Sequence, residues 1–320
     1  MAKNIEGELP EPPTKPLDSD CCGNGCTPCV YDIYDEEVAQ WQKFCEMSGE
    51  ERAAALNTTN KITSVASNSL SLTHYTSLTI TDIKRITEDT VLYRFALPPN
   101  TSLNMCVGQH LVLRARNHDG TMVSRQYTPI SKLDQVNYFE VIIKLYPSGA
   151  MSQHISQWNV GSRAEWKGPF GSFLYQPNKF ERIAMLACGT GIAPMVQVIR
   201  QVVENENDDT RIHLVYGCRT QHDILMKDFL DECRQYWNFS VLYALSNTSP
   251  QEVLADKGTL KYQDNVHYGR ITFDLVTSEM PPPSLAASNF VLICGTKSFD
   301  KDMINCVLKL GYAKCHYFKF

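Results

Sequence analysis

Two short glycine-containing segments of this chain have the residue types and the spacing to bind a phosphate group. The first, residues 189–194 (GTGIAP), follows an apolar run at residues 183–187 and opens an amphipathic stretch. Its two glycines let a ligand approach the backbone closely, and Pro194 is tolerated because the first N–H groups of a helix have no intrahelical partner. The pattern differs from the G-x-G-x-x-G of ordinary dehydrogenases, and a tight turn without a ligand could also produce it.

The second segment, residues 147–152 (PSGAMS), follows an apolar run at residues 141–146 and leads into another amphipathic stretch. A turn that opens a helix presents unpaired backbone N–H groups and the positive end of the helix dipole, so it suits a pyrophosphate. The hydroxyl of Ser152 adds a hydrogen-bond donor. The same residues would also serve as a plain helix N-cap without a ligand.

Two other segments stand at the ends of expected strands. Residues 125–128 (RQYT) finish a strand that Pro129 stops, which leaves the last side chains near the rim of a domain. Residues 294–296 (CGT) finish an apolar strand at the carboxyl edge of a sheet, where open α/β folds collect their ligands. An ordinary strand with a solvated arginine, and a buried cysteine acting as a small hydrophobe, would give the same two segments.

The elements that must position these segments change in character along the chain. Between residues 76 and 175, short alternating or β-branched runs predict an antiparallel barrel or sandwich. These strands are expected at residues 77–86, 90–96, 110–115, 123–128, 139–145 and 162–166. Beyond residue 182, apolar strands alternate with amphipathic helices, which predicts a doubly wound parallel α/β sheet covered on both faces. Its strands are expected at residues 183–187, 212–216, 240–245 and 290–293, and its helices at residues 192–203, 223–236 and 299–310.

The four segments occur in an order and spacing that resembles the ferredoxin-reductase-like flavoproteins, most closely the NADH–cytochrome b5 reductase family. Each motif alone would turn up by chance, but their ordered occurrence within residues 76–320 is specific. The resemblance implies FAD and NADH as cofactors, bound where the barrel meets the α/β domain. There a hydride would pass from nicotinamide C4 to flavin N5, and electrons would then leave singly to an acceptor protein such as cytochrome b5.

The resemblance also implies roles for individual residues. Arg125 would pair with the FAD pyrophosphate as a planar, permanently charged fork, and Tyr127 would lie against the isoalloxazine. The hydroxyl of Thr128 would sit near flavin N5, while Cys294 would lie beside the nicotinamide and shape the site without acting as a nucleophile. Thr128 and Cys294 are therefore the catalytic candidates. The cofactor-binding candidates are Arg125, Gln126, Tyr127, Thr128, Ile142, Lys144, Tyr146, Gly149, Ala150, Met151, Ser152, Gly189, Thr190, Gly191, Pro194, Cys294, Gly295 and Phe320.

The chain departs from the family pattern at several positions. Ala150 stands where a lysine usually precedes the methionine, so phosphate pairing by that charge is lost and only the backbone of the loop remains. Thr296 replaces a proline that often follows the glycine. NADPH-using relatives tend to carry a Ser-Arg pair where this chain has Ser246 and Asn247. Since Arg219 is the only nearby cation in the sequence, NADH is the expected coenzyme.

A cysteine cluster near the amino terminus resembles the short oxidoreductase-like domain attached to some b5-reductase-like proteins. Cys21, Cys22, Cys26 and Cys29 could coordinate zinc or hold an iron–sulfur cluster, but a second C-x-x-C pair is missing. A redox or turn-stabilising role therefore stays open beside metal binding. Apolar and aromatic residues at helical spacing follow up to about residue 45, so one helix is expected after the cluster.

The composition sets the broad class of the chain. Its 320 residues suffice for two domains with separate cores, and its 30 basic and 35 acidic residues include no basic block for nucleic acid. No apolar run is long enough for a transmembrane helix and no signal or transit peptide is recognisable, so a soluble cytoplasmic protein is expected. The expected order is a disordered tail (1–20), a Cys-rich module (21–46), a linker (47–72), an FAD-binding barrel (73–177) and an NAD-binding α/β domain (178–320).

Two other functions remain open at the level of sequence. The reductase could serve a different acceptor, such as a ferredoxin-like protein or a quinone. A non-catalytic adaptor could instead act through the Cys-rich module without any flavin. Yellow purified protein would favour the enzyme, whereas colourless protein that cannot be reconstituted with flavin would favour the adaptor.

Overall fold

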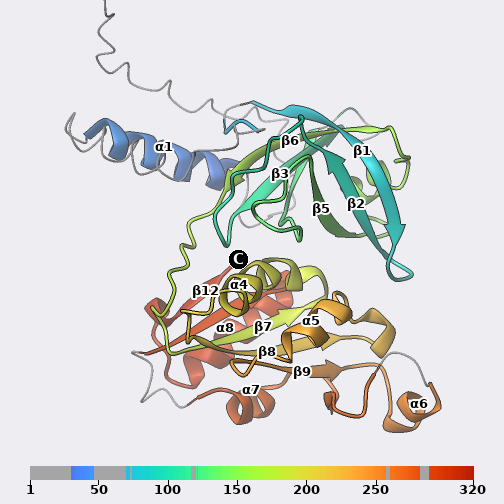
Figure 1. The fold of residues 1–320 in the computed structure, drawn as a ribbon, viewed down its shortest axis with the longest axis vertical. Helices are drawn as coiled ribbons and strands as arrows, with labels where there is room; N and C mark the ends of the chain where they lie inside the picture. The colour runs from blue at the N-terminus through green and yellow to red at the C-terminus, as the bar shows by residue number, and fades with distance from the viewer. Residues whose placement is uncertain are drawn as a thin grey trace, which may run out of the picture.

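The computed structural model describes residues 30–46, 70–72, 74–116, 120, 122–256, 260–281 and 288–320. In these residues a helix, α1 (Val30–Glu46), precedes two six-stranded sheets, one antiparallel and one parallel (Figure 1). The antiparallel sheet stacks over the parallel one, so the predicted succession of an antiparallel barrel and a doubly wound α/β sheet is confirmed.

The first sheet is built only from antiparallel pairs. Its strands are β1 (Thr76–Arg85), β2 (Thr90–Ala96), β3 (His110–Arg116), β4 (Met122–Tyr127), β5 (Tyr138–Lys144) and β6 (Arg163–Phe170), in the order β4-β3-β6-β1-β2-β5. The edge strands β4 and β5 also contact each other, so the sheet curls toward a closed barrel. A short helix, α3 (Ala150–Ile155), connects β5 to β6. Trp166 fills the interior, with ring-centroid distances of 5.0 Å to Phe95 and 5.4 Å to Phe139.

The second sheet is parallel throughout. Its strands are β7 (Arg182–Cys188), β8 (Arg211–Cys218), β9 (Phe239–Leu245), β10 (Asn265–Tyr268), β11 (Asn289–Cys294) and β12 (Tyr317–Lys319), in the order β10-β9-β8-β7-β11-β12. Its helices are α4 (Ile192–Val203), α5 (Lys227–Cys233), α6 (Pro250–Ala255), α7 (Phe273–Glu279) and α8 (Lys297–Lys309). Residues 183–187 of β7 are all buried, as expected for a parallel strand covered on both faces. The strand order reverses between β7 and β11, which makes their carboxyl ends the switch point where such folds bind ligands.

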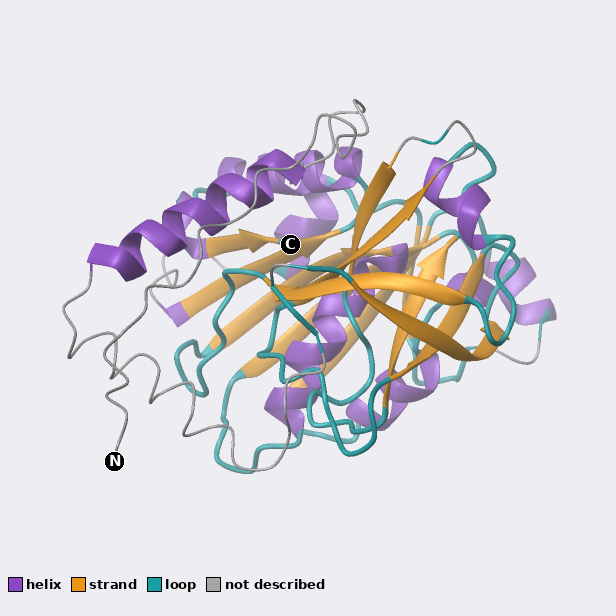
Figure 2. Cartoon of the chain, turned by 90° about the horizontal axis from the view of Figure 1, so that it is seen from above, coloured by secondary structure: helices purple, strands orange, loops and turns teal. Residues whose placement is uncertain are grey.

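Helices cover both faces of the parallel sheet. α4 and α5 pack on the face turned toward the barrel, and α7 and α8 pack on the opposite face (Figure 1). Figure 2, which looks down on the molecule, shows the barrel strands crossing over the parallel sheet. Ile130, Ile142 and Phe173 from the barrel side belong to the same buried cluster as Met195 and Ile199 of α4. α4 is therefore the helix through which the two sheets share an apolar core.

Most of the predicted elements are confirmed, and α4 has the predicted bounds. The helix expected at residues 223–236 is shorter, because Asp223 closes a 3-10 turn by a capping box with Thr220. Met226 then adopts a left-handed φ of 59°, so α5 begins only at the next residue. The short elements β10, β12, α6 and α7 are not predicted from the sequence, because they are too brief for a clear hydrophobic period.

Part of the sequence prediction concerns residues that the structure does not describe. The cysteine cluster at residues 21–29, the predicted tail (1–20) and most of the predicted linker lie outside the described residues. α1 begins at Val30, in agreement with the helix predicted after the cluster. None of the described helices is long and apolar enough to cross a membrane. In the sequence, the antiparallel sheet ends before residue 178 and the parallel sheet begins after it. The domain ranges 73–177 and 178–320 remain predictions.

Candidate functional site

The ends of β7 and β11 meet at the switch point of the parallel sheet. The two strands are neighbours, with Ala187 opposite Cys294, and each strand runs directly into its motif. A Cβ atom built on Gly191 would lie only 2.1 Å from the carbonyl oxygen of Cys294, so the two backbones approach as closely as a glycine permits. The structure thus brings together residues 189–194 and 294–296, which are far apart in the sequence.

The loop between β7 and α4 is open toward a ligand. Gly189, Thr190 and Gly191 form a 3-10 turn, and Gly189 has a left-handed φ of +55°. Apart from its own chain neighbours, no group of the described residues lies within 4 Å of the place where its Cβ would be. The buried Tyr216 fixes this turn from β8, because its hydroxyl donates a hydrogen bond of 2.9 Å to the carbonyl of Gly189. α4 begins with no side-chain cap, no acidic residue in its first turn, and Pro194 in that turn. The positive end of the helix dipole is therefore free of negative side chains and suits a phosphate.

Cys294 carries a neutral thiol in this arrangement. Burial raises the pKa of the Cys294 thiol to about 12, with a smaller contribution from the carboxylate of Asp300. At neutral pH the group is therefore protonated, and a protonated thiol is a poor nucleophile. Gly295, the next residue, leaves no room for a side chain, because a Cβ there would lie 2.4 Å from the ring of Phe299. These contacts fit a residue that shapes a pocket.

The last residue of the chain lies next to Cys294. The backbone N–H of Phe320 donates a hydrogen bond of 3.0 Å to the carbonyl of Ile293, which continues the pairing of β12 with β11. The Phe320 ring packs edge-on against Phe173, with the ring centroids 5.5 Å apart. Phe173 follows the last barrel strand, so Phe320 stands between the sheet edge and the barrel, where Figure 1 marks the carboxyl terminus.

The end of β4 offers polar side chains to a ligand. Arg125 donates a hydrogen bond of 2.7 Å to the carbonyl of Ser124, and no carboxylate among the described residues pairs with it. The Nε2 group of Gln126 is buried and has no hydrogen-bond partner within the described part of the chain. Buried donors are normally paired, so this position fits an acceptor atom of a bound group. The guanidinium of Arg125 beside the unpaired amide of Gln126 fits a cofactor such as FAD.

Tyr127 anchors that strand end in the barrel core. Its ring packs edge-on against Trp166, with the centroids 6.0 Å apart, and burial raises the pKa of its hydroxyl. Thr128 follows as a half-buried residue directly before the buried Pro129. The predicted contact of Tyr127 with a flavin would therefore come from the part of the ring that Trp166 leaves uncovered.

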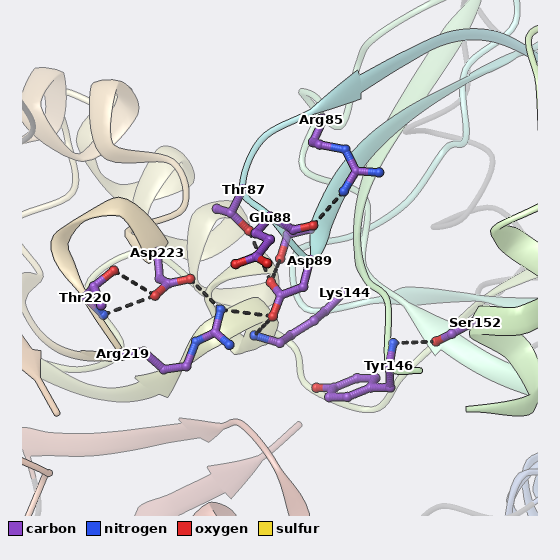
Figure 3. Close-up of polar contacts among 11 residues, drawn as sticks. Arg85, Thr87, Glu88, Asp89, Lys144, Tyr146, Ser152, Arg219, Thr220 and Asp223 are labelled. Atoms are coloured by element: carbon purple, nitrogen blue, oxygen red, sulfur yellow. Dashed lines mark hydrogen bonds and ion pairs between the residues drawn. The ribbon is translucent and has the colours of Figure 1, made fainter. Parts of the chain in front are cut away.

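The turn between β5 and α3 is held by its own residues. The hydroxyl oxygen of the buried Ser152 accepts a hydrogen bond of 3.0 Å from the backbone N–H of Tyr146 (Figure 3). Met151 packs into the barrel core, and Ala150 packs at its edge. Gly149 is the N-cap residue of α3 and forms no side-chain capping hydrogen bond. The side chains of Met151 and Ser152 thus serve the fold, and a phosphate contact here would come from the backbone around Gly149.

A network of charges crosses between the two domains beside this turn (Figure 3). Asp89, in the turn between β1 and β2, pairs with Lys144 at 3.0 Å and with Arg219 of the α/β domain at 2.9 Å. Arg219 also pairs with Asp223 at 2.6 Å. Burial opposes ionisation of Asp89, but the hydrogen bond and charge of Lys144, helped by Arg219, keep the pKa of Asp89 below its ordinary value. Arg219, the cation that the sequence predicts near a coenzyme phosphate, therefore already pairs with two carboxylates.

Three residues at contacts around the candidate site are not predicted from the sequence: Asp89, Asp223 and Gln197. Gln197 left one signal, as a polar residue within the otherwise apolar start of α4, and it is hydrogen-bonded to the barrel backbone. Asp89 and Asp223 left none, since the sequence does not distinguish an aspartate that forms an ion pair from any other surface aspartate. Ile142, predicted as a cofactor contact, is buried in the cluster that the barrel shares with α4.

The described ranges contain no group of three His, Cys, Asp or Glu side chains that converge as metal ligands. Three free cysteines stand at the ends of adjacent strands, and burial raises the pKa of each thiol; they are Cys188, Cys218 and Cys294. The candidate metal ligands at residues 21–29 lie outside these ranges, so metal binding by them stays a prediction.

Three family models match separate parts of the chain. The oxidoreductase FAD-binding domain matches residues 77–175, and the oxidoreductase NAD-binding domain matches residues 185–306. The model of the amino-terminal region of oxidoreductase-like proteins matches residues 5–49. The first two matches fall on the barrel and on the parallel sheet, and the third includes the cysteine cluster.

Two curated relatives align with nearly the whole chain. The proteins named NADH-cytochrome b5 reductase-like from Mus musculus and from Homo sapiens are each 37% identical to it over 308 residues, covering 96% of this chain and 95% and 94% of those proteins. Among solved structures, the cytochrome b5 reductase domain of Ulva prolifera nitrate reductase superposes with a TM-score of 0.68 at 24% identity. That superposition covers 79% of this chain and 100% of the Ulva domain, and it supports the fold.

Proposed function

This chain belongs to the NADH–cytochrome b5 reductase-like family of FAD- and NAD-binding oxidoreductases, and we propose that it delivers electrons from NADH to a one-electron acceptor such as cytochrome b5. The observation that carries the proposal is the meeting of Gly191 with Cys294 at the switch point. The 3-10 turn at Gly189–Gly191 also contacts β5 of the barrel, so the nucleotide and flavin halves adjoin. Bound FAD supplies the chemistry, by accepting a hydride from NADH and releasing its electrons one at a time.

The end of β4 is the part of the chain that we assign to FAD. Arg125 would pair with the pyrophosphate, since its guanidinium has no carboxylate partner in the described residues. Gln126 would donate its unpaired Nε2 group to an acceptor of the cofactor. Tyr127 would lie against the ring system and Thr128 would place its hydroxyl near flavin N5. The backbone at Gly149 would add phosphate contacts.

The carboxyl edge of the parallel sheet is the part that we assign to NADH. The glycine loop and the uncapped start of α4 would receive the phosphates. Cys294 would seat the nicotinamide as a protonated, uncharged group, and Gly295 would keep the backbone there close to α8. Phe320 would close the site on the barrel side. Thr128 and Cys294 would thus bring flavin and nicotinamide together from opposite domains.

We propose NADH as the preferred coenzyme over NADPH. A 2′-phosphate needs a cation to pair with, and the guanidinium of Arg219 already pairs with Asp89 and Asp223. The hydroxyl of Ser246 donates a hydrogen bond of 3.3 Å to the carbonyl of Cys218, so it too is engaged. An extra phosphate beside these two carboxylates would meet repulsion.

The acceptor is tested by reducing the purified flavoprotein with NADH under anaerobic conditions and then adding candidate acceptors one at a time. Cytochrome b5, a ferredoxin-like protein and a quinone separate the three acceptor classes. Fast reoxidation of the flavin by cytochrome b5, with slow reoxidation by the other two, is the expected result. Preferred reoxidation by the ferredoxin-like protein or the quinone would replace the proposed acceptor and leave the NADH half of the proposal intact.

A further inference from the structure

α4 begins at the glycine loop, and one of its side chains is hydrogen-bonded to the backbone of the barrel domain. Gln197 is only 2% exposed, in a helix whose neighbouring residues are apolar. Its Oε1 atom accepts a hydrogen bond of 2.9 Å from the backbone N–H of Gly108. Its Nε2 group donates to the carbonyl of Pro129 at 3.0 Å and to the carbonyl of Gln109 at 3.4 Å.

These backbone groups belong to two different loops of the barrel domain. Gly108 has a left-handed φ of +87°, and a Cβ there would lie 2.5 Å from the ring of Phe173, so its loop is tightly packed. Pro129 directly follows Thr128, the residue that we place beside the flavin. Gln197 therefore connects the helix of the glycine loop to the segment that carries Thr128.

Arg200, one turn further along α4, extends this contact. Its Nη1 group donates a hydrogen bond of 2.9 Å to the carbonyl of Ile130, the residue after Pro129. Its guanidinium also lies over the ring of Phe229, 4.9 Å from the centroid. Residues three apart on a helix share one face, so the same side of α4 holds the two carbonyls that follow Thr128.

An amide is not needed at this position to fill space. A buried polar side chain is costly unless both its donor and its acceptor are paired, and Gln197 meets this condition. A methionine of similar length would pack there without any such requirement. What the amide adds is direction, because its donor and its acceptor fix two loops relative to α4.

We propose that Gln197 is a positioning residue for hydride transfer, an inference that rests on the proposed function. α4 carries the glycine loop at its start, so the contacts of Gln197 set how far the bound nicotinamide lies from the Thr128 segment. Transfer between two bound groups depends steeply on their geometry, and a displacement of about 1 Å can cost roughly a hundredfold in rate. The Asp89–Arg219 pair joins the same two domains, but it is partly exposed and meets the barrel at the turn between β1 and β2.

The test compares Gln197→Met and Gln197→Glu with Gln201→Met as a matched control. Methionine removes all three hydrogen bonds, whereas glutamate keeps an acceptor for the Gly108 N–H and loses the donor to the carbonyls of Pro129 and Gln109. Gln201 lies one turn further along α4, and its side chain forms no hydrogen bond within the described residues. Its replacement therefore reports the cost of a methionine on the helix alone.

Each variant is purified with FAD, and anaerobic stopped-flow gives its limiting rate of flavin reduction and its NADH dissociation constant. Both Gln197 variants should lose about tenfold or more in limiting rate, with the NADH dissociation constant within about threefold of the wild type and FAD retained. The visible circular dichroism of the bound flavin should also change, because the Thr128 segment shifts beside it. Gln201→Met should match the wild type in rate and in spectrum.

An unchanged limiting rate together with an unchanged spectrum in both Gln197 variants would overturn the proposal. An equal loss in Gln201→Met, or a loss of FAD in step with the rate, would also overturn it, since either would indicate a general structural role. Should NADH fail to reduce the wild-type flavin, the proposed function would fall. The circular dichroism would then still decide whether Gln197 positions the Thr128 segment.

Discussion

At the carboxyl edge of the parallel sheet, the surface that we propose for the nucleotide is backbone, with Gly191 against the carbonyl of Cys294. At the end of β4, the groups that we propose for the flavin are side chains, chiefly those of Arg125 and Gln126. The first arrangement leaves no room for one more atom, because a Cβ at Gly191 would overlap the main chain of β11. The second can lose one side chain while the strand that carries it stays in place.

This difference indicates how each half should respond to substitution. Main chain inside a sheet is closely packed and cannot move far without disturbing its neighbours. A substitution on the nucleotide side should therefore either leave the local packing intact or disrupt it as a whole. A side-chain site loses binding energy in steps, with each hydrogen bond to a charged group worth about 1.5–3 kcal/mol. Substitutions in the two halves should therefore differ in size and in kind.

Gly191→Ala should have the largest effect. The φ of −61° at Gly191 suits alanine, so the overlap with Cys294 is the obstacle that remains. Its relief needs a shift of main chain, and we expect a loss of about 1–3 kcal/mol in the free energy of unfolding. NADH-dependent flavin reduction should be lost as well. Urea denaturation and anaerobic stopped-flow measure the two effects.

Gly189→Ala is the matched control for crowding in the same turn. Beyond its chain neighbours, its Cβ would meet no described group within 4 Å, so only the left-handed φ of +55° costs stability, by about 1 kcal/mol. Equal destabilisation by the two substitutions would show that the contact with Cys294 is unimportant. Wild-type stability in Gly191→Ala would contradict the backbone-built description of this half.

Arg125→Ala should rank second and should act on FAD affinity. The loss of a charged partner of the pyrophosphate should weaken FAD binding by about 2 kcal/mol, or roughly thirtyfold in the dissociation constant. Titration of the apoprotein with FAD, followed by fluorescence, measures this. Arg114→Ala is the control, because Arg114 lies on the adjacent strand β3 and pairs with Glu165 at 3.1 Å. Full flavin content in Arg125→Ala after extensive dialysis would remove Arg125 from the site.

Cys294→Ser should have the third-largest effect. It changes only a side chain, in the half of the proposed site where the contacts come mainly from backbone. FAD should stay bound, and flavin reduction should slow by about three- to tenfold as the nicotinamide is seated less well. Stopped-flow reduction by NADH measures this, with Cys306→Ser on α8 as the control. Traces that match the wild type would exclude Cys294 from the reacting geometry.

Arg219→Gln should have the smallest effect, since the residue belongs to neither half. Its side chain is 51% exposed, which limits the worth of its ion pairs to under about 1 kcal/mol of stability. The effect should shrink as salt is added, and in the double variant Asp89→Asn should add only the loss of its pair with Lys144. Denaturation at low and high salt measures this. A rise in the kcat/KM for NADPH relative to NADH would show instead that Arg219 governs coenzyme choice.

The sequence predicts those elements whose conformation depends on residues close to one another along the chain. The buried run at residues 183–187 and the apolar face of α4 carry their own period, so their form and bounds are readable. The helix predicted at residues 223–236 is shorter in the structure, and the reason is also local. Asp223 stands at the start of the amphipathic pattern, but it closes a capping box there and does not begin the helix.

The parts that the sequence does not predict depend on contacts between distant residues. Gln197 meets Gly108 across 89 positions of the chain, and Asp89 meets Arg219 from another domain. Neither pairing leaves a periodic or compositional trace. The motifs therefore predict the two halves of the proposed site, whereas the way in which α4 joins them is visible only in the fold.

The most direct test of hydride transfer by this protein is the anaerobic reduction of its bound flavin by NADH that carries deuterium at nicotinamide C4. A single-turnover experiment follows the loss of the visible flavin absorbance with labelled and unlabelled coenzyme. We predict that unlabelled NADH bleaches the flavin, that the deuterated coenzyme does so more slowly, and that NADPH is a poor substitute. Flavin that stays bound and remains oxidised in the presence of NADH would contradict the assignment.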